Sequence, residues 1–105
     1  MTDKKKPTYD LDAFKTAFSS AKRLNVTATA LKGAAALGFG AAEIVATIQT
    51  MQREHFYKSM TAHRDYRVWQ DVYYVPSEGG LLYIKFTADV VTEFVLLSFK
   101  EKDND

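Results

Sequence analysis

The sequence predicts an α+β domain in which helices come first and an antiparallel sheet follows. The first half is rich in alanine and places apolar residues at helical spacing, whereas aromatic and β-branched residues dominate from Phe56 onward. Short connections between the expected strands favour an antiparallel meander, with the helices on one face of the sheet. The 105 residues suit one domain, in which segments 1–8 and 101–105 are expected to be flexible.

Three helices are expected before the sheet. The first covers residues 11–23 and begins at an N-cap, Asp10. Residues 25–27 interrupt the helical pattern or form a short strand, and a second helix over 28–37 stops at Gly38. A third helix follows Gly40 and ends near Arg53, and its inward residues are Ile44, Val45, Ile48 and Met51.

Four strands are expected near residues 56–62, 67–75, 81–88 and 93–100, with a clear turn over 76–80 and a weaker one over 88–92. Because successive strand residues point to opposite faces, one side of the last two strands is apolar, through Leu82, Ile84, Phe86, Ala88, Val95, Leu97 and Phe99. The other side then carries Tyr83, Lys85, Ser98 and Lys100. Parity alone leaves the faces of Lys58 and Gln70 open, and Trp69 is assigned to the core.

Composition excludes several classes of function. The chain has no cysteine, which removes disulfides and thiolate chemistry, and it has no apolar run of about 18 residues that would span a membrane. The N-terminus has basic residues without an apolar stretch behind them, so no secretory signal and a cytoplasmic location are expected. A net charge of +1 argues against a dedicated duplex-DNA binder and requires any nucleic-acid role to use a local basic pocket.

Four strand residues stand out as candidates for chemistry: Lys58, Gln70, Tyr83 and Lys100. Cationic and neutral hydrogen-bonding groups without clustered carboxylates suit binding of a phosphodiester without a metal. The competing interpretation is that strand lysines are surface charges that discourage aggregation and that a strand glutamine is a structural hydrogen-bonder.

Other sites find less support in the sequence. His55 and His63 lie eight residues apart on one expected strand, roughly 26 Å, so they do not form an acid–base pair, although His63 alone remains a candidate assistant. No metal-ligand spacing and no glycine-rich phosphate loop occurs. Helix-turn-helix spacing over 34–48 is better explained by core packing, because segment 41–48 carries one charge, Glu43.

Blocks of the second half resemble the MqsR family of bacterial type II toxins, a branch of the RelE-type mRNA interferases. The blocks are FYKSMT (56–61), VWQDVY (68–73), YIK (83–85) with Thr87, and SFKEK (98–102). Their order and spacing agree with the family over about 56–102. The resemblance implies a RelE-like α+β fold and cofactor-independent cleavage of mRNA at GCU-like sites. It also implies a cognate antitoxin that itself binds DNA, with no membrane partner and no direct DNA binding by the toxin alone.

The resemblance carries the family's active-site residues onto Lys58, Gln70, Tyr83 and Lys100. Lys85 is a further RNA-binding candidate, and so are Arg64 and Arg67 because of their place in the loop between the first two strands. The two site lysines are expected to stabilise negative charge while the RNA 2′-hydroxyl attacks, Gln70 to hold phosphate or ribose, and Tyr83 to stack a base or donate a proton. Some members carry a histidine near the start of the last strand, but residues 89–94 contain none. Two alternatives are a catalytically inactive relative that binds RNA or antitoxin, and a DNA-binding regulator using the 28–53 helices.

Overall fold

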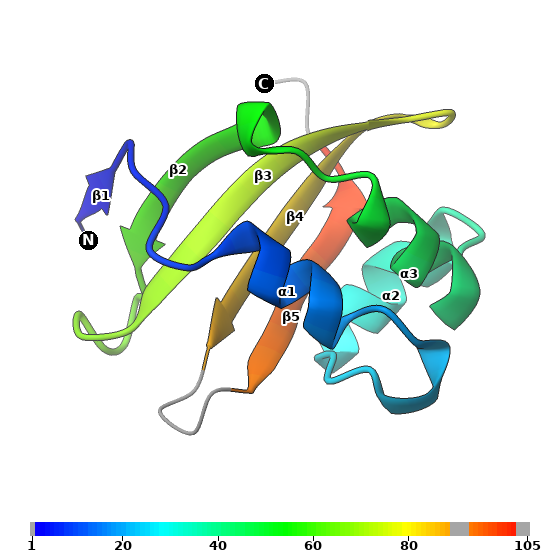
Figure 1. The fold of residues 1–105 in the computed structure, drawn as a ribbon, viewed down its shortest axis with the longest axis horizontal. Coiled ribbons are helices and arrows are strands. Elements are labelled where there is room, and N and C mark those ends of the chain that lie inside the picture. Colours follow the sequence, from blue (N-terminus) through cyan, green and yellow to red (C-terminus); the bar gives the residue numbers. More distant parts are fainter. Residues whose placement is uncertain (1, 89–92, 103–105) are drawn as a thin grey trace.

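A computed structural model describes residues 2–88 and 93–102 and shows an α+β fold (Figure 1). The described helices are α1 (Leu11–Ala17), α2 (Ala28–Ala36) and α3 (Ala41–Gln49), with 3-10 turns η1 (Ala21–Arg23) and η2 (Arg53–His55). The strands are β1 (Asp3–Lys4), β2 (Phe56–Thr61), β3 (Trp69–Ser77), β4 (Gly80–Ala88) and β5 (Phe94–Glu101). They form one antiparallel sheet in the order β1-β2-β3-β4-β5, which confirms the predicted fold class and meander.

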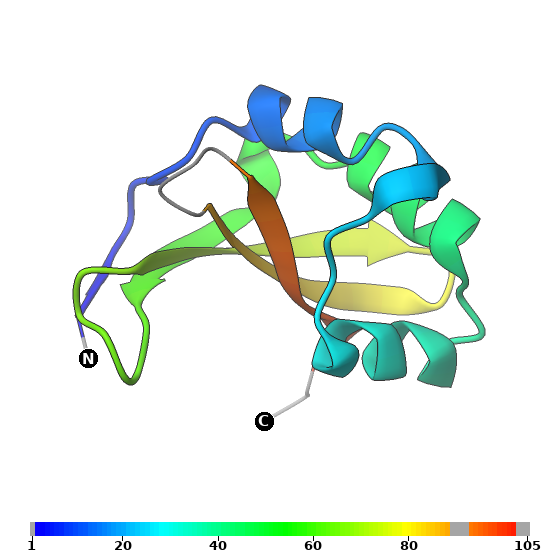
Figure 2. The ribbon, with the colours of Figure 1, turned by 90° about the horizontal axis from the view of Figure 1, so that it is seen from below.

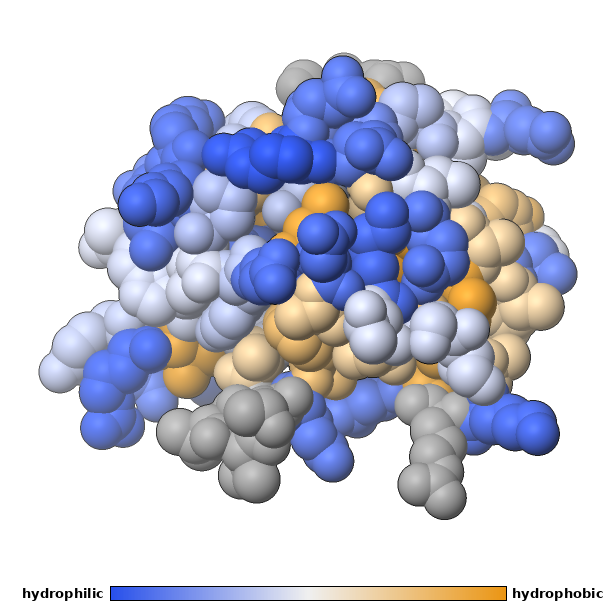
Figure 3. All heavy atoms as spheres, in the orientation of Figure 1, coloured by the Kyte–Doolittle hydropathy of each residue, from blue (hydrophilic) through white to orange (hydrophobic). Residues whose placement is uncertain are grey.

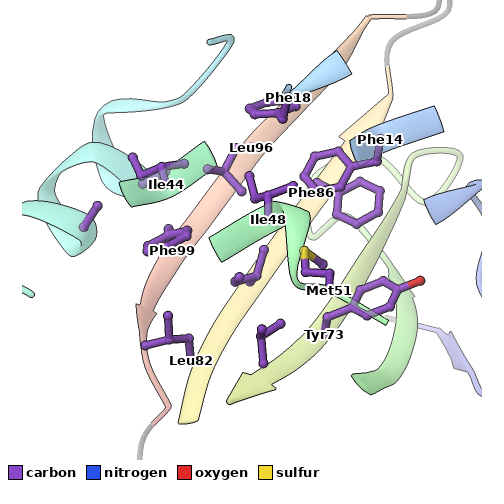
Figure 4. Packing of buried hydrophobic residues seen from close by; sticks show 14 residues of the cluster. Phe14, Phe18, Ile44, Ile48, Met51, Tyr73, Leu82, Phe86, Leu96 and Phe99 are labelled. Atoms are coloured by element: carbon purple, nitrogen blue, oxygen red, sulfur yellow. The ribbon is translucent and has the colours of Figure 1, made fainter. Parts of the chain in front are cut away.

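Helices α1 and α3 lie on one side of the sheet, as Figure 2 shows. The core between these layers is built by Phe14 of α1 and its C-cap Phe18, by Ile44 and Ile48 of α3, and by the inward strand residues Tyr73, Ile84, Phe86, Leu96 and Phe99 (Figure 4). The rings of Phe14 and Phe86 stack with centroids 3.7 Å apart. On the outside of this layer, hydrophilic side chains are interrupted by apolar patches (Figure 3).

The second helix packs along strand β5. Segment 25–27 pairs with β5 through a parallel bridge between Val26 and Leu96, which agrees with the short strand expected there. Thr27 then caps α2, because its hydroxyl accepts a hydrogen bond from Ala30 N–H and donates one to the carbonyl of Leu97. Gly38, at φ 78°, ends this helical stretch as predicted. One edge of the sheet is therefore covered by backbone pairing and a helix.

Two helices end earlier than the sequence predicts. The first stops at Ala17 instead of residue 23, since Ser19 donates to the carbonyl of Thr16 and Ser20 accepts from Lys22 N–H. Such side-chain bonds compete with helical pairing of the backbone. The third stops at Gln49 instead of near Arg53, and a separate 3-10 turn begins at Arg53. Ile44, Ile48 and Met51 are buried as expected, while Val45 is half-buried.

The N-terminal segment contacts the sheet from Thr2 onward. Asp3 and Lys4 pair with β2, and the buried Asp71 carboxylate accepts hydrogen bonds from the N–H groups of Thr8 and Tyr9. Tyr9 adds a hydrogen bond from its hydroxyl to the carbonyl of Trp69. Residues 2–9 are thus attached along β2 and β3, which brings Lys4, Lys5 and Asp3 close to the sheet.

The predicted alternation of faces is wrong for the first part of strand β5. A bulge opposite Lys85 and Phe86 inserts one residue, so Leu96 and Phe99 are the buried residues. Val95 and Leu97, expected in the core, are half-buried and line a cavity on the other side with Thr87. One inserted residue moves every earlier residue of the strand to the opposite face of the sheet. A rule that only alternates residues between faces does not detect such an insertion.

Two further local expectations need adjustment. Trp69 is half-buried and lies outside the core cluster, where the Lys4 ammonium sits 4.2 Å from its ring centroid. Pro76, Ser77 and Gly80 belong to strands, so the clear turn narrows to Glu78 and Gly79. The weaker turn falls on residues 89–92, outside the described part of the chain. Among the described helices, none alone is long and apolar enough to cross a membrane; α2 and α3 meet that test only as a pair bent by 91°.

Candidate active site

The register of the sheet places the predicted catalytic residues on the face opposite the helix-covered core. Lys58 pairs with Val72, Val72 with Lys85, and Lys85 with Ser98, which forms one row across four strands. The next row is Tyr74, Tyr83 and Lys100, and Gln70 lies on the other side of the first row. These positions alternate along the strands with the buried Tyr73, Ile84 and Phe99. We call this surface the open face, and it carries Lys58 and Lys100 together.

A bulge in β2 settles the orientation that the sequence left open for Lys58. Phe56 pairs with Tyr73 on the core side, yet Lys58 pairs with Val72 on the open face, so Tyr57 is the extra residue. Gln70 pairs with Met60 and follows the parity of Val72. Its side chain is half-buried on this face.

Lys85 occupies the middle of the open face. It stands between the strands that carry Val72 and Ser98, with Tyr83 two residues away on the same strand. Burial, and then the positive charge of Lys100, lower the pKa of Lys85 below its ordinary value of 10.5. The neutral amine is therefore more accessible here than on an exposed lysine.

Tyr83 and the two outer lysines frame that central amine. Burial, followed by repulsion from Tyr57, raises the pKa of Tyr83, which keeps its phenol protonated and able to donate. The Lys100 ammonium lies 5.3 Å from the Tyr83 ring centroid. Lys58 lies three strands and one two-residue step away from Lys100, so their backbones are about 16 Å apart. Its ammonium is 3.4 Å from a carboxylate oxygen of Asp3 in β1, a neighbour that the sequence did not predict.

The other predicted residues lie at the margins. Arg64 and Arg67 are exposed in the loop that joins β2 and β3, beyond Gln70. Arg67 pairs with Asp65 at 3.1 Å, and this contact lowers the pKa of Asp65. Arg67 also borders a cavity of about 490 Å³ with Thr87, Val95 and Leu97. His55 accepts a hydrogen bond from Gln52 N–H before β2, and His63 is exposed beyond its far end.

Sequence reasoning missed the aromatic part of the open face. The Tyr57 and Tyr74 rings stack with centroids 4.3 Å apart, and Lys5 and Lys102 contact them. The tyrosines and lysines can be read directly in the sequence. That they lie on one face of the sheet follows from the β2 bulge and from the pairing of β1, which the sequence did not predict. Within the described ranges, no group of three or more His, Cys, Asp or Glu side chains is arranged to hold a metal ion.

Comparison with known proteins identifies the class to which this fold and face belong. Residues 6–101 match the family described as motility quorum-sensing regulator, toxin of MqsA, and the chain belongs to this MqsR toxin family. A particular relative is the mRNA interferase toxin MqsR of Escherichia coli strain K12, which is 36% identical over 83 residues. That alignment covers 79% of this chain and 83% of the relative. The family resemblance found in the sequence is confirmed.

Proposed function

We propose that this protein is an endoribonuclease toxin that cleaves mRNA. The observation that carries the proposal is the gathering of Lys58, Lys85 and Lys100 on one sheet face, with the neutral groups Gln70 and Tyr83 beside them. Membership of the MqsR toxin family and similarity to a relative named an mRNA interferase support the same activity. The open face supplies the local basic surface that a chain of net charge +1 needs in order to bind a polyanion.

The proposed reaction is an internal transfer of the phosphodiester. The RNA 2′-oxygen attacks the adjacent phosphorus, the bond to the 5′-oxygen breaks, and the products are a 2′,3′-cyclic phosphate and a 5′-hydroxyl. Lys85, with its lowered pKa, accepts the proton of the 2′-hydroxyl. The protonated phenol of Tyr83 donates a proton to the leaving oxygen, and this step needs no metal ion.

The remaining site residues stabilise the transition state and orient the RNA. Lys58 and Lys100 place positive charge on either side of the phosphorane oxygens, where charge develops in the transition state. Gln70 holds the phosphate or ribose so that the attacking 2′-oxygen and the leaving 5′-oxygen stay in line through the phosphorus. Arg64 and Arg67 contact the RNA backbone as it leaves the site. From the family resemblance we further propose selectivity for GCU-like sites, neutralisation by a DNA-binding antitoxin, and action in the cytoplasm.

The test compares Lys58→Ala and Lys100→Ala with wild type on a transcript pool whose cut ends are mapped. We expect each variant to lose cleavage by at least about 100-fold, because a group that stabilises transition-state charge is typically worth that much. Lys22→Ala, which removes an exposed lysine of η1, is the matched control and should cleave normally. Circular dichroism of each variant checks that the fold is intact.

Three outcomes would contradict the proposal. Full cleavage by either site variant would remove that lysine from the mechanism. Loss of cleavage in EDTA would indicate a metal-dependent nuclease. Cutting of single-stranded DNA would exclude attack by the 2′-hydroxyl, because DNA lacks that group.

A further inference from the structure

Three tyrosine rings form a continuous row across the open face, beside the proposed catalytic lysines. The rings of Tyr57 and Tyr74 stack with centroids 4.3 Å apart and an interplanar angle of 16°. Tyr74 and Tyr83 follow at 6.1 Å and 44°. The row runs from β2 through β3 to β4 and meets Lys100 on β5, and we call it the tyrosine track.

Each ring of the tyrosine track is contacted by lysine ammonium groups. Lys5 and Lys58 lie 4.8 Å and 5.3 Å from the Tyr57 centroid. Lys102 lies 5.1 Å from the Tyr74 centroid, and Lys100 lies 5.3 Å from that of Tyr83. These four lysines come from an N-terminal segment, β2, β5 and the residue after it. The aromatic surface is therefore bordered by positive charge on several sides.

The track does not serve the hydrophobic core. None of its three rings belongs to the core cluster of the described residues. Tyr57 has 37% of its surface exposed, which lets a ligand reach its ring. Stacking of a nucleobase on an aromatic ring is worth roughly two to three times the free energy of an exposed lysine–ring contact. A base can therefore displace a lysine from a ring, and the displaced ammonium group then meets the phosphate of the same nucleotide.

We propose that the tyrosine track binds unpaired bases of single-stranded RNA next to the cleavage site. Tyr57 and Tyr74 stack bases, while the neighbouring row that contains Lys58 and Lys85 binds the phosphates, one two-residue step (about 7 Å) away along the strands. Duplex RNA hides the faces of its bases, so the track selects single-stranded segments. This inference rests on the proposed ribonuclease activity and adds a base-binding surface that positions the substrate.

The first test measures binding without cleavage. The probe is a fluorescent 2′-O-methyl RNA oligonucleotide that spans a site mapped with wild type and that lacks the attacking hydroxyl. We expect Tyr57→Leu and Tyr74→Leu to weaken its binding about 5- to 100-fold in fluorescence anisotropy, the range found for loss of a base–aromatic stack. Tyr57→Phe and Tyr74→Phe keep the rings and should bind within about twofold of wild type. In cleavage assays the Leu variants should raise KM far more than they lower kcat, because the phenols of Tyr57 and Tyr74 transfer no proton.

A second arm needs no substitution. An abasic oligonucleotide of the same length keeps the phosphates and lacks the bases, and wild type should bind it at least about fivefold more weakly than the 2′-O-methyl RNA. Equal affinity for the two probes would overturn the inference even if the Leu variants failed to fold.

The outcomes separate the two proposals. If wild type cleaves RNA but both Leu variants bind the probe within twofold, the track is not a base-binding surface and the ribonuclease proposal stands. If wild type neither cleaves nor binds RNA, the proposed function fails. If the Leu variants instead lose affinity for an acidic antitoxin segment while RNA affinity is unchanged, the track is a protein-binding surface and the inference is wrong.

Discussion

At the scale of single residues, Lys85 differs from the other lysines of the open face in its surroundings. Strands lie on both sides of it, with Val72 and Ser98 as its direct neighbours, whereas Lys58 and Lys100 stand nearer the margins. An ordinary lysine is almost fully protonated near neutral pH and is a poor general base. Burial and the charge of Lys100 lower the pKa of Lys85, so this position suits proton transfer better than its neighbours do.

The pH profile of cleavage tests the role of Lys85. For wild type we expect kcat/KM to rise with pH and to level off above a pKa that lies below the ordinary lysine value, because the reaction needs the neutral amine. In Lys85→Arg the guanidinium stays protonated to above about pH 12, so the rise should disappear and cleavage at pH 7 should fall about 100-fold or more. The measurement is kcat/KM from pH 6 to 9.5 at constant ionic strength, with Lys22→Arg as control. An unchanged rise in Lys85→Arg would assign the titration to another group.

At the scale of elements, the position of Lys100 depends on how closely α2 approaches β5. A Cβ added to Gly33 would lie 2.2 Å from the carbonyl oxygen of Phe99 and 3.2 Å from the Cβ of Lys100. Real Cβ atoms do not approach a carbonyl oxygen so closely, and the obstacle is backbone that cannot rotate away. Glycine at this position lets the helix seat against the edge strand, and the helix in turn sets the backbone that carries a site lysine.

Substitution of Gly33 separates packing from helix propensity. Alanine is favoured over glycine inside a helix by about 1 kcal/mol, yet we expect Gly33→Ala to lower the free energy of unfolding by about 1–2 kcal/mol, because overpacking of this contact outweighs that gain. Ala35→Gly, at an exposed position of the same helix, changes propensity alone and should cost about 1 kcal/mol. Urea unfolding measures both. A stabilised Gly33→Ala would show that α2 is not held tightly against β5.

The elements also show how far the sequence alone could lead. Alternation along β4 predicted the common face of Tyr83 and Lys85, because that strand keeps its parity up to the bulge opposite it. Alternation failed for Val95 and Leu97 and left Lys58 undecided, because an inserted residue in β5 and in β2 shifts the register without any marker in composition. The N-terminal attachment was unpredictable for another reason: the contact between Thr8 and Asp71 joins residues 63 positions apart.

At the scale of the whole molecule, the tyrosines link the core to the open face. Burial raises the pKa of Tyr73 to about 12, and its hydroxyl points away from the core cluster (Figure 4) without a hydrogen-bond partner among the described residues. Burial, then interaction with Tyr57, raises the pKa of Tyr74 to about 12 as well, and the pKa of Tyr83 is raised. Half of the six tyrosines therefore favour the neutral form in the folded state.

Stability should fall at high pH for this reason. The unfolded chain loses the phenolic protons of Tyr73 and Tyr74 near pH 10, while the folded chain keeps them to about pH 12, so folding binds protons in between. The contribution is fully present below pH 10 and is lost as the pH rises towards 12, at about 2–3 kcal/mol for Tyr73 alone. Urea unfolding from pH 9 to 11.5 measures the slope, and Tyr73→Phe should make it shallower. An equal slope in that variant would place the alkaline sensitivity elsewhere.

The contacts between lysines and tyrosine rings have one further consequence. A β-sheet face with aromatic side chains invites a second copy of the chain to stack on it, as sheets do in sandwiches and fibrils. Here such a copy would bring its own ammonium groups against those above Tyr57, Tyr74 and Tyr83. Like charges would then lose their water together, which costs free energy. The open face therefore repels a second copy of the chain and attracts a polyanion. The repulsion disfavours self-association through this face.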